Sequence, residues 1–130
     1  MNQTKGKILV VDDERLILIG IKALFKDAGY YVQTAATPQQ AIAIAEKEVF
    51  DIAYVDLIMP QMNGVEVCRR IKQISPATQV VLMSGHPEEI ENKKHDFYQA
   101  GGMKKIINKP FDFEEMIAIA NKVARKIKEK

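Results

Sequence analysis

Short runs of apolar, mostly β-branched residues recur along the chain and alternate with longer segments that carry an apolar stripe at helical spacing. The runs cover residues 7–11, 31–34, 51–55, 79–83 and 103–108, and the helical segments begin near residues 14, 37, 64, 88 and 112. Runs without polar alternation are typical of strands that are buried on both faces. Since parallel strands need crossover connections that cover the sheet, these strand–helix units predict an α/β fold, a doubly wound parallel five-stranded sheet with helices on both faces.

Local signals support several of these segments. Thr37 can cap the second helix, with Pro38 in its first turn and Gln40 placed to complete a capping box. The helix over residues 88–99 has few apolar anchors, Ile90 and Phe97, so we expect it to be the least firmly held. Apolar stripes mark the buried faces of three other helices: Ile17, Ile21, Leu24 and Phe25 in the first, Val67, Ile71 and Ile74 in the third, and Met116, Ala120, Val123 and Ile127 in the last.

Composition narrows the class of protein. The 130 residues fit a single domain, 1–130 with a core of about residues 7–126, and a net charge of +2 is too small to indicate a nucleic-acid surface. No apolar run approaches a membrane span, and the first residues are too polar for a signal peptide. Cys68 stands alone, and His86 and His95 have no companions at metal-ligand spacing. We therefore expect a soluble, cytoplasmic protein that contacts neither nucleic acid nor membrane.

The polar residues of greatest interest follow the predicted strands directly. Asp12 and Asp13 follow the first strand, Asp56 the third, Ser84 the fourth and Lys109 the fifth. Because the carboxyl ends of the strands meet at one edge of an open α/β sheet, these side chains are expected to share one cleft. Three carboxylates about 5 Å apart repel by roughly 3 kcal/mol per pair at an effective dielectric of about 20, so positive charge has to neutralise them. Lys109 is one candidate, and Mg²⁺, which prefers oxygen ligands, is another.

This constellation suits phosphoryl transfer to a carboxylate. A carboxylate can attack phosphorus to give an acyl phosphate, and the reaction needs little else beyond alignment and neutralisation of charge on the equatorial oxygens. Asp56 is the expected acceptor, Asp12 and Asp13 hold the metal beside it, and Lys109 pairs with the phosphoryl group. Ser84 can donate a hydrogen bond to a phosphoryl oxygen only once the phosphate has arrived, so this contact differs between the two states, as a switch requires.

These residues also match the motifs of a known family. The chain resembles the receiver domains of bacterial two-component response regulators from residue 7 to about residue 126, through Asp12-Asp13, Asp56 with Met59-Pro60 and Asn63-Gly64, Ser84-Gly85, and Lys109-Pro110-Phe111. The resemblance implies a flavodoxin-like fold with strand order 2-1-3-4-5. It implies that Asp56 is phosphorylated from the phosphohistidine of a sensor histidine kinase or histidine phosphotransferase, and that the backbone carbonyl of Ile58 is a further Mg²⁺ ligand.

The resemblance has further implications for activity and partners. A cis peptide bond is implied between Lys109 and Pro110. The domain would be a signalling switch and not a turnover enzyme, because it would catalyse only its own phosphotransfer and slow autodephosphorylation. Its surface for a downstream target, of unknown identity, is expected on the fourth helix, the fifth strand and the fifth helix.

Two positions depart from the family pattern. Ile106, three residues before Lys109, stands where the family often has an aromatic residue, so we expect a change in Ile106 packing to report movement of Ser84. Ile58, two residues after Asp56, cannot hydrogen-bond an attacking water, which predicts a long-lived acyl phosphate.

Other interpretations fit parts of the sequence. Taken alone, Asp13 is best explained as a cap of the first helix. A flavin or dinucleotide binder would need a glycine- or hydroxyl-rich loop where this chain has Asp12-Asp13-Glu14, which would repel a bare phosphate. A dehalogenase-type phosphatase usually carries a second acid where Ile58 stands. The alternative function is a phosphorylation-independent, receiver-like interaction module, and the chain is expected to be either a stand-alone receiver or a fragment of a larger regulator.

Overall fold

The computed structural model describes residues 4–128, which form five strands and five helices in strict alternation. The strands are β1 (Lys7–Val11), β2 (Tyr31–Ala35), β3 (Ile52–Asp56), β4 (Gln79–Ser84) and β5 (Ile106–Asn108). The helices are α1 (Arg15–Asp27), α2 (Pro38–Lys47), α3 (Gly64–Ile74), α4 (Pro87–Gln99) and α5 (Phe113–Lys128). The predicted alternation of strands and helices is confirmed, with most boundaries displaced by one or two residues.

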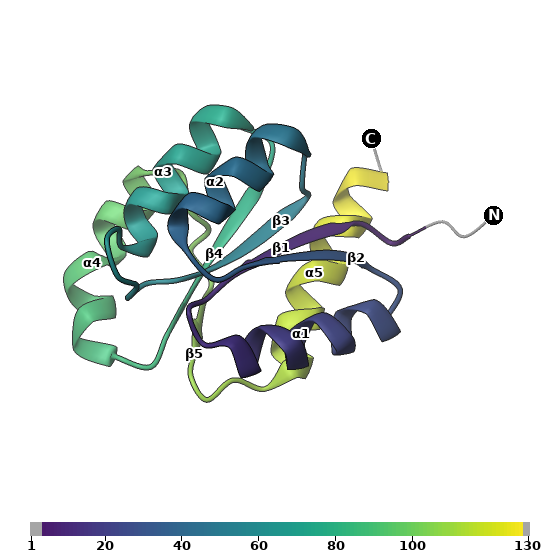
Figure 1. Cartoon of the computed structure of the whole chain (residues 1–130), viewed down its shortest axis with the longest axis horizontal. Coiled ribbons are helices and arrows are strands. Elements are labelled where there is room, and N and C mark those ends of the chain that lie inside the picture. The colour runs from purple at the N-terminus through teal and green to yellow at the C-terminus, as the bar shows by residue number, and fades with distance from the viewer. Residues whose placement is uncertain (1–3, 129–130) are drawn as a thin grey trace.

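The strands form one parallel sheet in the order β2-β1-β3-β4-β5, which confirms the doubly wound α/β class and the flavodoxin-like strand order (Figure 1). In the register of the sheet, Asp56 of β3 lies opposite Met83 of β4, and Ser84 of β4 lies opposite Asn108 of β5. The carboxyl ends of β1, β3, β4 and β5 therefore meet at one edge of the sheet, where the expected site residues follow.

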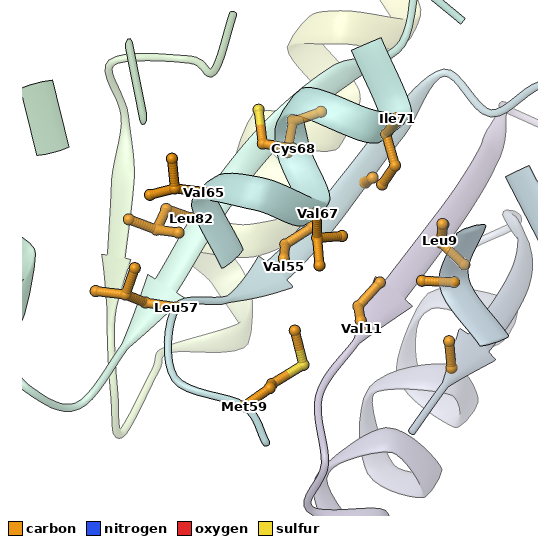
Figure 2. Close-up of a cluster of buried hydrophobic side chains, with 14 of the residues drawn as sticks. Leu9, Val11, Val55, Leu57, Met59, Val65, Val67, Cys68, Ile71 and Leu82 are labelled. Carbon is orange, nitrogen blue, oxygen red and sulfur yellow. The ribbon is translucent and has the colours of Figure 1, made fainter. Parts of the chain in front are cut away.

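Alternate strand residues supply a hydrophobic core on each face of the sheet. Helices α2, α3 and α4 cover one face, and α1 and α5 cover the other (Figure 1). On the first face, Leu9, Val55 and Leu82 pack with residues of α3 that include Val67 and the fully buried Cys68 (Figure 2). The opposite face is built from the intervening strand residues, such as Ile8, Val10, Tyr54 and Val81. Burial on both faces explains why the strands read as nearly continuous apolar runs.

The predicted cap of α2 is present. Thr37 Oγ1 accepts a hydrogen bond from Gln40 N at 3.1 Å, and Gln40 Oε1 accepts one from Ala36 N at 2.9 Å, one residue further back than in an ideal capping box. Helix α4 is anchored by Ile90 and Phe97, as predicted. Among residues 4–128, no helix has the length and apolarity needed to cross a membrane.

Four details of the sequence prediction are wrong. Strand β5 begins at Ile106, because the exposed Lys104-Lys105 pair before it lies outside the ladder at the sheet edge. Leu24 is 48% exposed, since the buried stripe of α1 runs through Leu18, Ile21 and Phe25 and turns Leu24 away from the sheet. Ile74 and Ile127 are 39% and 49% exposed, because both lie in the last turn of their helices.

Candidate functional site

Three carboxylates converge at the carboxyl ends of β1 and β3. One carboxylate oxygen from each of Asp12, Asp13 and Asp56 lies within 4.8 Å of the other two. Asp12 is fully buried and Asp56 is 5% exposed, whereas Asp13 is exposed. The capping interpretation of Asp13 is wrong: α1 has Glu14 as its N-cap without a side-chain hydrogen bond, and it is Asp12 Oδ1 that accepts a hydrogen bond from Glu14 N at 2.9 Å.

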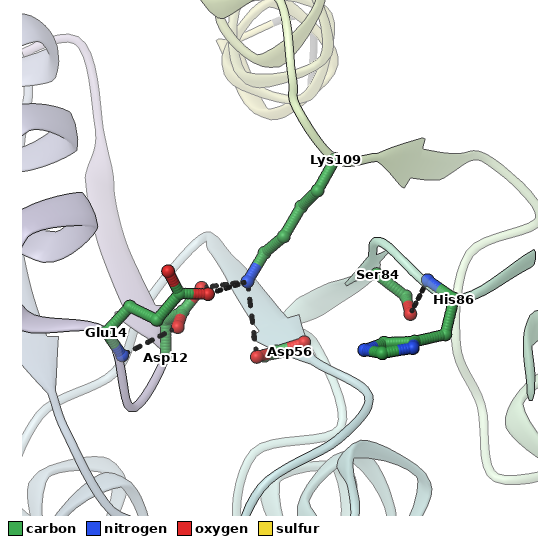
Figure 3. A network of polar contacts seen from close by, with 6 residues as sticks. All are labelled: Asp12, Glu14, Asp56, Ser84, His86 and Lys109. Carbon is green, nitrogen blue, oxygen red and sulfur yellow. Dashed lines mark hydrogen bonds and ion pairs between the residues drawn. The ribbon is translucent and has the colours of Figure 1, made fainter.

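Lys109 supplies positive charge to this cluster from the end of β5. Its Nζ lies 2.6 Å from Asp12 Oδ2, 3.2 Å from Asp56 Oδ2 and 3.4 Å from Glu14 Oε1 (Figure 3). The backbone N–H of Lys109 donates to the Ser84 carbonyl oxygen at 2.8 Å, which fixes the root of the lysine against β4. The peptide bond between Lys109 and Pro110 is cis, as the resemblance implied.

The charges of the cluster shift the ionisation of its members. Burial, followed by the neighbouring Asp12 carboxylate, raises the pKa of Asp56 to about 6, although Lys109 and the Ile58 backbone N–H act in the opposite direction. Burial alone would lower the pKa of Lys109, but the carboxylates of Asp12 and Asp56 outweigh it and hold this pKa above its usual value. Asp56 is therefore mostly ionised at neutral pH, and Lys109 is charged.

Ser84 ends β4 beside the carboxylates and is fully buried. Its Oγ accepts a hydrogen bond from the backbone N–H of His86 at 3.0 Å (Figure 3). On the neighbouring strand, Ile106 lies opposite Leu82 and is half-buried against the core beneath α3 and α4. The two positions expected to form a switch thus lie on adjacent strands, one at the site and one at the edge of the core.

The loop after β3 is held close to the acceptor strand. Gly64 N donates to the Leu57 carbonyl oxygen at 2.8 Å, and a Cβ at this position would lie 2.5 Å from the Asp56 carbonyl oxygen. Only glycine permits this approach. Asn63 then caps α3, since its Oδ1 accepts a hydrogen bond from Glu66 N at 3.1 Å. The family motif Asn63-Gly64 therefore has a local physical function: it starts α3 directly against the backbone of Asp56.

The residues surround a cavity of about 570 Å³ that opens to solvent. Its lining consists of Asp13, Glu14, Ile17, Asp56, Ile58, Gly85, His86, Lys109 and Pro110. The three carboxylates of Asp12, Asp13 and Asp56 lie beside this cavity, and two of them are buried. Their oxygen atoms are suitable ligands for a hard divalent cation, which takes carboxylate ligands and retains waters. The cluster can therefore bind a metal ion.

Two residues of this cavity, Glu14 and His86, have no predicted role in the site. The sequence marks Glu14 only as an acid that repels a bare phosphate, whereas in the structure its carboxylate reaches Lys109. His86, which has no companion at metal-ligand spacing in the sequence, lines the cavity with its imidazole pointing toward Asp56 (Figure 3). Their closeness in sequence to Asp13 and Ser84 was the available signal. His95 is exposed on α4.

Comparisons with known proteins agree with this site. A model of the response regulator receiver domain family matches residues 8–121. The alginate biosynthesis transcriptional regulatory protein AlgB of Pseudomonas aeruginosa is 32% identical over 106 residues, which cover 82% of this chain and 23% of AlgB. Sporulation initiation phosphotransferase F of Bacillus subtilis is 34% identical over 112 residues, which cover 85% of this chain and 86% of that protein.

The fold has equally close counterparts among solved structures. A CheY-like response regulator receiver domain protein from Methanospirillum hungatei matches with a TM-score of 0.85 and 30% identity, covering 95% of this chain and 98% of that one. The chain spans about a quarter of the length of AlgB but most of the length of the sporulation phosphotransferase. With its strand order, its acidic cluster and its match over residues 8–121, the chain belongs to the response regulator receiver domain family of two-component systems.

Proposed function

We propose that this receiver domain is the phosphoacceptor of a two-component phosphorelay, and that Asp56 takes a phosphoryl group from a protein phosphohistidine in a Mg²⁺-dependent reaction. The observation that carries this proposal is the convergence of Asp12, Asp13, Asp56 and Lys109 at one open cavity. Burying carboxylates against one another opposes folding, so chemistry at Asp56 explains the arrangement better than stability does.

The proposed step forms one bond and breaks another. A carboxylate oxygen of Asp56 attacks the phosphorus of the donor phosphohistidine, so that an O–P bond forms as the P–N bond breaks. The donor imidazole leaves with the electron pair of the P–N bond and takes up a proton from solvent. A pKa of about 6 leaves Asp56 mostly ionised, and therefore nucleophilic, at neutral pH. Lys109, 3.2 Å from the attacking carboxylate, is placed to neutralise charge on the phosphoryl oxygens.

The metal ligands in this proposal are the carboxylates of Asp12, Asp13 and Asp56 together with the backbone carbonyl of Ile58. When bound there, Mg²⁺ supplies positive charge to the phosphoryl oxygens. The mutual approach of the three carboxylates supports this ligand set, and Ile58 lines the adjoining cavity. Lys109 Nζ lies 2.6 Å from Asp12 Oδ2, so the ammonium has to share Asp12 with the ion.

The switch in this proposal runs from Ser84 to Ile106. In the present state, Ser84 Oγ accepts a hydrogen bond from His86 N, and its hydroxyl proton can turn to a phosphoryl oxygen once one stands on Asp56. A displacement of Ser84 would change the space next to the half-buried Ile106 on β5. The packing of Ile106 then reports phosphorylation to the surface formed by α4, β5 and α5, which we propose as the binding surface for the downstream target.

The proposed phosphodonor is a sensor histidine kinase or a histidine phosphotransferase. Helix α1 offers such a partner two exposed apolar side chains, Leu16 at 84% and Ile19 at 67% exposure, next to Ile17 at the cavity. One sheet with a core on each face supports the proposed single domain, with its core at about residues 7–126. Of the expected range 1–130, residues 1–3 and 129–130 lie outside the described residues.

The test is the intact mass of the protein after incubation with acetyl phosphate, with Mg²⁺ or with a chelator. We expect wild type to gain one phosphate only when Mg²⁺ is present, and Asp56→Asn to gain none. Asp27→Asn, the same substitution at an exposed residue at the end of α1, is the matched control and should behave as wild type. Failure of wild type to gain phosphate under conditions where Mg²⁺ binds would favour the phosphorylation-independent interaction module.

A further inference from the structure

Glu14 stands where the cavity opens to solvent. Its side chain is 61% exposed and lines the cavity together with Asp13 and Asp56. Its Oε1 lies 3.4 Å from Lys109 Nζ, and Asp56 Oδ2 lies 3.2 Å from the same nitrogen (Figure 3). Because two carboxylates that share one ammonium are near neighbours, a phosphoryl group that reaches Asp56 comes within range of the negative charge of Glu14.

Among the described residues, the Glu14 carboxylate contacts no hydrogen-bond or ion-pair partner other than Lys109. The side chain does not cap α1, and the backbone N–H, not the carboxylate, provides the contact with Asp12. The carboxylate also lies outside the group of three that can hold a metal ion. It adds a further negative charge to a cavity in which Lys109 is the only Lys or Arg among the described lining residues.

We propose that Glu14 is a specificity-determining residue that slows phosphorylation by small dianionic phosphodonors and thereby favours a phosphoryl group presented by a docked protein. This inference rests on the proposed function of Asp56. Coulomb repulsion acts on every phosphoryl group that approaches the cavity. A docked protein donor offsets the repulsion with the free energy of its own contacts, whereas a small dianion has none to offset it.

The inference is tested with two small donors of different charge. Acetyl phosphate is a dianion at neutral pH, and phosphoramidate is a net monoanion. The second-order rate constant for phosphorylation of Asp56 is measured by intact mass for wild type, Glu14→Gln and Glu14→Asp, at low ionic strength and at a Mg²⁺ concentration that saturates each variant. Glu88→Gln is the matched control, because Glu88 is an exposed acid in the first turn of α4 that does not line the cavity.

Glu14→Gln should raise the rate constant for acetyl phosphate about threefold to tenfold, and that for phosphoramidate by a smaller factor, since the repulsion scales with the charge of the donor. The gain should shrink as salt is added. Glu14→Asp keeps the charge and should stay within about twofold of wild type, and Glu88→Gln should match wild type. If Glu14 were a purely structural residue, the gain in rate constant should depend neither on the charge of the donor nor on the salt concentration.

Two results would overturn the inference for different reasons. If both proteins are phosphorylated at Asp56 but Glu14→Gln is no faster with acetyl phosphate, or gains equally with both donors at every salt concentration, Glu14 does not select donors and the proposed function stands. If neither donor phosphorylates wild type or Glu14→Gln at Asp56, the proposed function is wrong and the role of Glu14 is wrong with it.

Discussion

The two ends of the sheet both bury polar groups, but for opposite reasons. At the amino ends of the strands, the Thr78 hydroxyl donates to the Phe50 carbonyl oxygen at 2.6 Å and lies 2.9 Å from Ser75 Oγ. The half-buried Asp51 carboxylate accepts a hydrogen bond from Lys7 N at 2.8 Å. The hydrogen bonds of Thr78 with Phe50 and of Asp51 with Lys7 join segments that are distant in the chain, and each group meets its partner within the protein. Here buried polarity stabilises the fold.

At the carboxyl ends of the strands, buried groups of like charge repel one another. Asp12 and Asp56 are both carboxylates, both nearly inaccessible, and both depend on the single ammonium of Lys109. The elevated pKa of Asp56 records this repulsion as well as its burial. The difference between the ends shows that burial alone does not reveal the role of a polar group. A structural group is satisfied within the protein, whereas a functional one is held in an unfavourable environment that a ligand can relieve.

The largest effect should come from removing the cation. In Mg²⁺-free buffer, Lys109→Met should lower the free energy of unfolding by about 3 kcal/mol, because it leaves the buried Asp12 and Asp56 carboxylates without compensation. Urea unfolding measures this loss, and added Mg²⁺ should restore part of it. The control is Lys104→Met at an exposed lysine, which should cost little. If Lys109→Met and Lys104→Met are equally stable, the buried carboxylates do not need the charge of Lys109, and the proposed difference between the two ends of the sheet is wrong.

At the other end, Thr78→Val should lower the free energy of unfolding by about 2 kcal/mol, because the Phe50 carbonyl oxygen loses a buried donor while the shape of the side chain is kept. Urea unfolding at several Mg²⁺ concentrations checks this prediction. The loss should not depend on Mg²⁺, unlike that of Lys109→Met. A loss that Mg²⁺ reverses would mean that the two ends are coupled.

Asp56→Asn should act in the opposite direction and stabilise the Mg²⁺-free protein by about 1.5 kcal/mol at pH 7. The folded-state pKa of Asp56 is about 6 against a usual value of 3.8, so the folded protein binds the proton more tightly than the unfolded chain does. Wild type therefore loses stability as pH rises from about 4 to about 6. The asparagine variant does not, because its side chain at position 56 does not ionise. The expected stabilisation is smaller than the free energy that corresponds to the whole pKa shift of Asp56, because Asp56→Asn also removes an ion-pair partner of Lys109.

Thermal unfolding across this pH range checks the sign. The advantage of Asp56→Asn should be present above about pH 6 and vanish below about pH 4, where Asp56 is protonated in both folded and unfolded wild type. Mg²⁺ should narrow the gap, since binding stabilises native wild type. An asparagine variant that is less stable than wild type at pH 7 without Mg²⁺ would show that Asp56 is a structural group like Thr78.

The smallest effect concerns the lifetime of the acyl phosphate and not stability. Ile58, 41% exposed at the cavity, offers no hydrogen bond to an attacking water. Ile58→Asn should accelerate phosphate loss by about tenfold, equivalent to about 1.4 kcal/mol in the barrier, with little change in unfolding. The decay of phosphorylated protein after removal of the donor measures this rate, and a slower variant would contradict the role of Ile58.

The arrangement of the fold was predictable because it follows from patterns of apolar residues that are visible in the sequence itself. Apolar runs marked the strands, with the bounds of β1 at Lys7 and Val11 correct, and topology alone placed Asp12, Asp56 and Lys109 at one edge. The start of β5 was harder to predict from the sequence, because pairing at a sheet edge depends on the neighbouring strand and not on the apolar run.

Within the site, the features that escaped prediction depend on loop geometry. The reach of Glu14 to Lys109 and the direction of the His86 ring follow from how two loops leave the sheet, which periodicity does not record. The elevated pKa of Asp56 likewise needs the three-dimensional distance to Asp12 and the extent of burial. The sequence indicated which groups meet, and the structure adds how strongly they act on one another.

The central claim is that Asp56 itself forms the acyl phosphate, and chemical trapping tests it most directly. Protein treated with acetyl phosphate and Mg²⁺ is reduced with borohydride, which converts a phosphorylated aspartate to homoserine, and the peptides are sequenced by mass spectrometry. The account predicts homoserine at position 56 that depends on Mg²⁺ and is absent without the donor. Homoserine at Asp12 or Asp13 in place of Asp56, or at no position in protein that has gained phosphate, would contradict it.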